Sequence, residues 1–247
     1  MVLTSRLLTL VAAMLLGMAS SGYGQDSLTN GLVAYYPFNG SAQDESGNRN
    51  HGVARGASLA TNRFGLASVS YAFAKGSYVE TLNSVGFPIS TNDFTVSVWL
   101  SISAFPSPQA DAAMIFANKE LHQFQLGLKG VSATEGFLDF WTGGHPGGPP
   151  DCHTATNTWK LDTWYNVVVM RSQNIVSVYR DGIIVGQNET TFGNTAGPLL
   201  RNLEFGYRSS DRHGALFGQL DEIRIYSRAL LPAELQHLTN TPARGLP

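Results

Sequence analysis

Four residues with metal-binding side chains lie in the glycine- and proline-rich segment 142–156. They are His145, Asp151, Cys152 and His153. Imidazole, thiolate and carboxylate groups are ligands for transition metals. However, adjacent Cys152 and His153 need an unusual backbone to converge on one ion, and no Cys-x-x-Cys or His-x-x-x-His element supports them. The segment therefore favours a surface loop without regular structure over a zinc site.

Hydrolysis of a glycosidic bond would need two carboxylates that face each other across a cleft. The adjacent acids Asp221 and Glu222 are predicted to point to opposite faces of a strand. Glu135 and Asp139 lie four residues apart, but no third acid follows them. A Gly-x-Ser-x-Gly nucleophile motif is absent as well, and Cys152 has no base except its sequence neighbour. These patterns predict a protein that is not an enzyme.

Aromatic and cationic side chains beside loops suggest a different chemistry, the recognition of sugars. Trp141 precedes the glycine- and proline-rich segment and can stack on a sugar face, although it could equally belong to the core. Arg212 and His213 lie in a short polar segment and can donate hydrogen bonds to hydroxyl or carboxylate groups. We therefore select Trp141, Arg212 and His213 as candidate ligand-binding residues.

The segment from Asn39 to Gly52 has no apolar run and is predicted to be a long surface loop. Its oxygen-bearing side chains are those of Asn39, Asp44, Glu45, Asn48 and Asn50. Calcium prefers several hard oxygen ligands of this kind in flexible loops. In the alternative, such side chains bind the backbone of their own turns. The residue types leave both interpretations open.

Residues 1–24 have the pattern of a secretory signal peptide. Arg6 precedes a mostly apolar stretch from Leu7 to Met18, and small residues lead to a cleavage site after Gly24. The apolar stretch is too short to span a bilayer, and no later segment is longer, so we expect no membrane insertion. The prediction is a secreted protein, extracellular or periplasmic.

The composition favours an all-β domain. Only 14% of the residues are charged, whereas 26 are glycine and 11% are aromatic, a balance that suits sheets joined by turns. The net charge of −2 gives no electrostatic basis for binding nucleic acid. Cys152 is the single cysteine in the sequence, so we expect a free thiol, buried or partly exposed, or an intermolecular disulfide.

Alternating polar and apolar residues predict about a dozen strands. The clearest is 94–102, where Trp99 is the single aromatic residue on the polar face; we expect it to fill the layer between the sheet and the loops. Further strands are predicted at 32–38, 69–73, 78–82, 113–117, 123–128, 137–141, 164–171, 175–180, 183–185, 203–207 and 220–226.

A short helix is predicted near the C-terminus. Pro232 can begin it, and Leu231, Leu235 and Leu238 share one face. The pattern as a whole predicts a two-sheet antiparallel jelly-roll sandwich, all-β apart from this helix. We assign residues 25–240 to this domain and residues 241–247 to a flexible tail.

Several segments, in this order, resemble the LamG-like jelly-roll family of concanavalin A-like domains. They are GLVAYYPFNG (31–40), DESGNRNHG (44–52), NDFTVSVW (92–99), TWYNVVV (163–169), VYRDG (178–182) and GQLDEIRIYSRAL (218–230). The resemblance implies two stacked sheets with the chain ends paired, and it implies no common reaction. A related glucanase family carries its carboxylates as Glu-x-Asp-x-x-Glu, a run that this sequence lacks.

The resemblance also implies a structural calcium ion, which domains of this kind often hold near the paired chain ends. The ligands would be Asp221, the turn formed by Asn39 and Gly40, and Asp44. The family often has Asp in place of Asn39. In the alternative, Asp44 forms an Asx turn and Asp221 pairs with an arginine such as Arg224.

Family members include lectins, adhesins and modules of polysaccharide-processing enzymes, so the fold is a weak guide to function. The resemblance implies a secreted, non-catalytic binding module for carbohydrate or glycoconjugate recognition or adhesion. The alternative is an extracellular protein–protein interaction or structural envelope protein. Asn39 and Asn188 match the glycosylation acceptor pattern, whose use depends on the organism.

Overall fold

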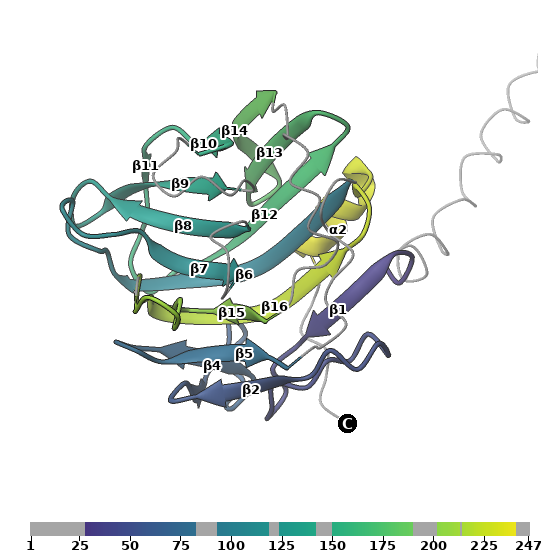
Figure 1. Ribbon diagram of the computed structural model, residues 1–247, viewed down its shortest axis with the longest axis horizontal. Helices are drawn as coiled ribbons and strands as arrows, with labels where there is room; N and C mark the ends of the chain where they lie inside the picture. Colours follow the sequence, from purple (N-terminus) through teal and green to yellow (C-terminus); the bar gives the residue numbers. More distant parts are fainter. Residues whose placement is uncertain are drawn as a thin grey trace, which may run out of the picture.

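Two antiparallel sheets, which we call sheet A and sheet B, stack face to face in the computed structural model (Figure 1). The structure describes residues 28–82, 93–118, 124–141, 150–189, 202–212 and 214–240. The predicted signal peptide, the tail 241–247 and His213 lie outside the described residues. The side of each sheet that faces away from the other sheet is called its outer face.

Within the described residues, each sheet has eight strands. Sheet A has the order β14 (Ile183–Glu189), β13 (Ile175–Arg180), β12 (Trp164–Ser172), β6 (Phe94–Ala104), β16 (Phe217–Tyr226), β4 (Ser70–Phe73) and β3 (Ser58–Ala60), and β1 (Leu32–Tyr36) also pairs with β16. Sheet B has the order β10 (Cys152–His153), β9 (Glu135–Trp141), β8 (Gln125–Gly130), β7 (Ala113–Asn118), β15 (Leu203–Phe205), β5 (Tyr78–Thr81) and β2 (Gly52–Arg55), and β11 (Asn157–Thr158) also pairs with β9. The predicted jelly roll is confirmed, and so is the pairing of the first and last strands.

One expectation about the chain is wrong, because the segment 142–156 is not wholly irregular. Cys152 and His153 form the short strand β10, in register with Phe140 and Asp139 of β9. The glycines and prolines of the segment end at Pro150, so the next residues are able to pair with the sheet.

The inward-facing side chains of both sheets form one core. In β6 the apolar side chains of the predicted alternation are buried between the sheets, and Trp99 lies on the outer face. Phe94, Phe116, Phe124 and Phe140 pack with ring centroids 5.2 to 6.4 Å apart. Each such ring contributes about 1.5–3 kcal/mol by leaving water, so this cluster is a large part of what holds the sheets together.

Cys152 belongs to the same core. Its thiol is free and its side chain is fully buried. Burial, together with the charges of Asp139 and Asp151, raises the pKa of this thiol to about 11. Of the alternatives left open for the free thiol, the buried one is therefore observed, and an intermolecular disulfide would require this edge of sheet B to open.

Helix α2 (Pro232–Asn240) lies on the outer face of sheet A, where its Leu235 and Leu238 pack with Tyr226 and Val168 (Figure 1). It begins at Pro232 as predicted, but Leu231, which was expected to share the buried face, precedes the helix and is exposed. The Glu234 carboxylate accepts a hydrogen bond from the Leu231 N–H at 2.7 Å, which satisfies a donor at the start of the helix. No helix in the described part of the chain is long and apolar enough to cross a membrane.

Two loops cover the outer faces. The segment 61–69, between β3 and β4, lies on sheet A, where the Arg63 guanidinium is 4.3 Å from the Trp99 ring centroid. Trp99 therefore fills the layer between sheet and loop, as expected. The segment 206–216, between β15 and β16, lies on sheet B, where the Gly214 carbonyl accepts a hydrogen bond from the Met114 N–H at 2.7 Å.

Candidate ligand-binding site

The predicted calcium ligands Asn39 and Gly40 form an exposed turn after β1. Gly40 has φ of 77°, a conformation that glycine adopts without steric cost. Its N–H lies 2.9 Å from the Ser68 carbonyl and 2.8 Å from the Phe38 carbonyl, so the turn is joined to the segment that leads into β4.

Asp44 is buried, and both of its carboxylate oxygens accept hydrogen bonds from the chain. Oδ1 accepts from the N–H groups of Tyr35 at 2.8 Å and Ser46 at 2.9 Å. Oδ2 accepts from the Ser46 hydroxyl at 2.9 Å and the Asn50 N–H at 2.8 Å. The bond to Ser46, two residues ahead, is the Asx turn of the alternative interpretation. A calcium ion at Asp44 would have to displace some of these donors.

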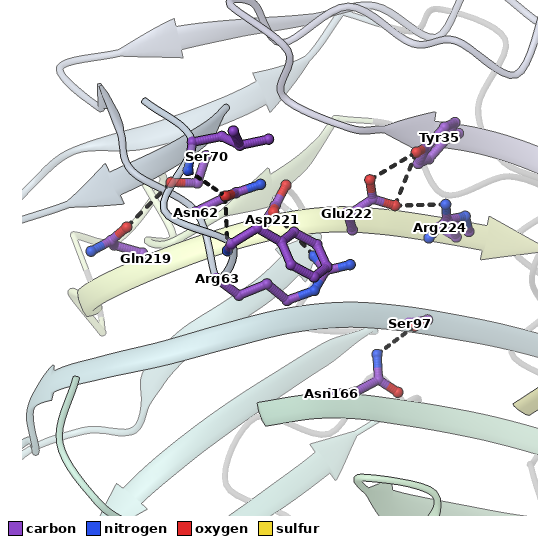
Figure 2. A network of polar contacts seen from close by, with 12 residues as sticks. Tyr35, Asn62, Arg63, Ser70, Ser97, Asn166, Gln219, Asp221, Glu222 and Arg224 are labelled. Atoms are coloured by element: carbon purple, nitrogen blue, oxygen red, sulfur yellow. Dashed lines mark hydrogen bonds and ion pairs between the residues drawn. The ribbon is translucent and has the colours of Figure 1, made fainter. Parts of the chain in front are cut away.

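Asp221 belongs to a separate network on the outer face of sheet A (Figure 2). Its Oδ2 lies 3.2 Å from Nη1 of Arg63, and both side chains are almost fully buried. The expected partner Arg224 instead contacts Glu222 at 2.6 Å. Asp221 thus pairs with an arginine, but with Arg63 from a loop rather than with the neighbour on its own strand.

The pKa of Asp221 is raised to about 7, because burial and the charge of Glu222 outweigh the opposing effects of Arg63 and Arg224. Burial also lowers the pKa of Arg63. Oδ1 of Asp221 has no hydrogen-bond partner within the described residues.

Asp221 pairs with Arg63, whereas Asp44 accepts hydrogen bonds from its own loop and from β1. The two carboxylates therefore do not contribute oxygen ligands to one common site. The described part of the chain has no group of three His, Cys, Asp or Glu side chains that could hold a metal. Calcium binding stays a prediction.

A β-bulge brings the two adjacent acids to the same face, so the predicted opposite orientation is wrong. The pairing of β16 with β6 shifts between Asp221 and Arg224, and Glu222 has φ of 52°. Glu222 accepts hydrogen bonds from the Tyr35 hydroxyl at 2.9 and 3.0 Å (Figure 2). An extra residue in one strand reverses the alternation of side chains beyond it.

Trp141 lies on the outer face of sheet B, at the end of β9. It is partly exposed and packs against Ala112, Met114 and Ala117. Its six-membered ring lies over Gly127 of β8, because a Cβ added there would be 3.3 Å from Cζ3 of Trp141 and 2.6 Å from the Ala112 Cβ. One part of the indole is thus held by small residues, and another part reaches solvent.

Polar side chains from β8 and from the segment 206–216 lie next to Trp141. Gln125 is its register partner on β8 and accepts a hydrogen bond from buried Arg208. Nε of Arg208 is 2.9 Å from Oδ1 of Asp211. The predicted Arg212 is exposed in the same segment, with φ of 61°. The structure therefore brings Trp141 and the segment of Arg212 to one face, while the predicted His213 lies outside the described residues.

The same face holds three residues that were not selected from the sequence as ligand-binding residues. Asp139 and Phe137 lie on β9 with Trp141, and Nδ1 of His153 on β10 is 2.7 Å from Oδ1 of Asp139. The Phe137 and His153 ring centroids are 4.5 Å apart. The alternation of the strand 137–141 carried the signal for Phe137 and Asp139, whereas the placement of His153 depends on β10, which was not predicted.

Comparison with known proteins agrees with this architecture. The family model described as the concanavalin A-like lectin/glucanases superfamily matches residues 73–236, and the chain belongs to that superfamily. No curated protein matches the sequence.

Among solved structures, domain 4 of AbnA, an extracellular arabinanase from Geobacillus stearothermophilus, was determined in complex with arabinotriose. It is 18% identical with a TM-score of 0.60, over 85% of this chain and 98% of that domain. The binding domain of Paraclostridial Mosquitocidal Protein 1 is 18% identical with a TM-score of 0.60, over 87% of this chain and 53% of that one.

A structure of botulinum neurotoxin type C, described as entering cells through two ganglioside molecules, is 11% identical with a TM-score of 0.59, over 87% of this chain and 52% of that one. The chain thus spans about half the length of the two toxin structures. At these identities the likeness concerns the fold.

Proposed function

We propose that this chain is a secreted, non-catalytic carbohydrate-binding module, extracellular or periplasmic, whose ligand lies on the outer face of sheet B. The observation that carries the proposal is the position of Trp141, a partly exposed indole supported by Gly127 and Ala112 and bordered by polar side chains. Aromatic rings bind the apolar face of a sugar, and fixed polar groups beside them select its hydroxyl groups.

The hydrogen bonds beside Trp141 support a preformed site. Arg208 is almost fully buried and is held by both Gln125 and Asp211, so these side chains are already ordered before a ligand arrives. Such preorganisation lowers the entropic cost of binding. The likeness to an arabinanase domain in complex with arabinotriose is further support, because that domain shares the fold over nearly its whole length.

The carboxylates support a non-catalytic role. Asp221 and Glu222 are both mostly buried and each is paired with an arginine, Asp221 with Arg63 and Glu222 with Arg224. On the outer face of sheet B, the partner of the Asp139 carboxylate is His153 and not a second carboxylate. Retaining and inverting glycosidases both need such a pair.

A glycan array with and without calcium, followed by isothermal titration calorimetry of the glycans bound, tests the proposal. We expect wild-type protein to bind at least one glycan. Trp141→Ala should bind it at least about tenfold more weakly, about 1.4 kcal/mol, as for an aromatic residue at the centre of an interface. The matched control is Phe217→Ala, which removes a ring that is 40% exposed on β16 of sheet A and should keep the affinity.

The experiment distinguishes a failure of the proposed function from a failure of the proposed site. A wild-type protein that binds no glycan on the array, in either condition, would refute the function. A Trp141→Ala protein that is folded and retains wild-type affinity would refute the site and leave the function standing.

A further inference from the structure

Three outward-facing residues of β9 form a row on the face that carries Trp141. Leu138 and Phe140 of this strand point into the core, so Phe137, Asp139 and Trp141 point to the outer face. Phe137 and Trp141 are four residues apart, which separates their Cα atoms by about 13 Å because a strand advances about 3.3 Å per residue. A single sugar ring cannot contact both aromatic side chains.

The centre of the row is polar and rigidly placed. Nδ1 of His153 is 2.7 Å from Oδ1 of Asp139, whose side chain is 8% exposed, while the His153 side chain is 54% exposed. In the neutral ring whose Nδ1–H donates to the Asp139 carboxylate, the second ring nitrogen, Nε2, is left as an acceptor that points away from Asp139. A sugar hydroxyl can donate to such a nitrogen.

The far end of the row is aromatic. Phe137 is partly buried, and its ring lies 4.5 Å from the His153 ring, at an interplanar angle of 50°. Its register partner on β8 is Lys129, whose ammonium reaches the Ala110 carbonyl at 3.3 Å. The Lys129 side chain is therefore directed toward the loop before β7 rather than across the Phe137 ring.

The surface beside the row is formed by small residues. Gly127 of β8 is the register partner of Asp139 and has no side chain that could rise between Phe137 and Trp141. The space above Gly127 is taken by the methyl group of Ala112 and the edge of Trp141. The row is thus an aromatic–polar–aromatic track bordered by small residues.

We propose that the ligand is a linear oligosaccharide that lies along β9, with one sugar on Trp141, another on Phe137, and the hydroxyl groups between them bound by the Asp139–His153 pair. The inference rests on the proposed function and adds to it the length and direction of the ligand. It excludes a compact, terminal monosaccharide as the complete ligand, because such a ligand would leave half of the track unused.

Calorimetry with length series of arabino-, xylo- and cello-oligosaccharides, from monosaccharide to tetrasaccharide, tests this inference. We expect the affinity of wild-type protein for one series to rise with each added sugar until the ligand spans the track. Phe137→Ala should bind the longest oligosaccharide about tenfold more weakly than wild type. A loss of this size is typical when an interface residue that contributes to binding is replaced by alanine. The same variant should bind the shortest member as the wild type does, whereas Trp141→Ala should weaken every member.

A second variant, His153→Ala, guards against the possibility that Phe137→Ala weakens binding only by disturbing the packing of the fold. The His153 side chain is more than half exposed, so its removal disturbs the packing less. His153→Ala should also lose affinity for the longer oligosaccharides and not for the shortest. Phe217→Ala should have the affinity of wild type for every oligosaccharide in the series. Equal affinity of Phe137→Ala, His153→Ala and wild type for the whole series, with a loss in Trp141→Ala alone, would overturn the inference and leave the proposed function intact. A glycan-array hit confined to single terminal sugars would have the same meaning.

Discussion

Replacing Asp221 by asparagine should remove a pH dependence of stability that arises from one buried carboxyl group. Burial raises the pKa of Asp221 from the usual 3.8 to about 7. Between these values the folded protein holds a proton that the unfolded chain has released, so the free energy of unfolding falls as the pH rises. The contribution is complete below about pH 4 and is lost through about pH 7. A difference of about 3 pKa units amounts to roughly 4 kcal/mol.

Urea unfolding of wild type and Asp221→Asn, followed by tryptophan fluorescence from about pH 4 to about pH 8, measures this contribution. Asparagine is neutral and has the shape of the protonated acid, so the variant should be close to wild type at the acidic end. Its stability relative to wild type should then increase by roughly 4 kcal/mol toward the basic end. Glu45→Gln, at an exposed position in the loop after β1, should give a stability curve parallel to that of wild type. Parallel curves for wild type and Asp221→Asn would refute the account of this network.

Two further predictions concern the thiol and calcium. Cys152 should react with a thiol reagent far more slowly in the folded protein than in denaturant, because it is buried and its pKa is raised to about 11. Fast labelling of the folded protein would contradict the position of Cys152 in the core, and so would a dimer that a reducing agent dissociates. If the turn at Asn39 and Gly40 binds calcium with Asp44, millimolar calcium should raise the midpoint of thermal unfolding and chelation should lower it, whereas an unchanged midpoint would remove these residues and Asp221 as ligands.

The sheet architecture was predictable where side chains alternate. The strand predicted at 94–102 begins where expected and has the expected orientation, because Phe94, Val96 and Val98 alternate with small polar residues on a half-buried surface; it runs two residues further than predicted, to Ala104. The shortest strands were missed. Cys152 and His153 form β10 through their register with β9, and such pairing between distant segments leaves no local pattern.

The networks beside the sheets were less predictable. Arg224 was the expected partner of Asp221 because it is close in sequence, yet Arg63 takes that place from a loop whose position is set by tertiary packing. The bulge at Glu222 was also not visible, because a non-glycine residue with positive φ is uncommon and no glycine or asparagine marks the position. On sheet B, Trp141 could be selected from the sequence because it is a tryptophan beside a loop. The residues next to it on β8 and β10 could be identified only from the pairing of these strands with β9.

The central place of β16 has a consequence for how the chain folds. This strand, from Phe217 to Tyr226, pairs with β6, β4 and β1, and it joins Tyr35 to Glu222 across 187 residues of sequence. Sheet A therefore cannot close during synthesis until the last strand has emerged, and pairings this distant form slowly. Until then β6 presents an unpaired edge, which invites association between nascent chains. We expect folding yield, more than final stability, to limit production of this protein, and chaperones that delay collapse to increase the yield.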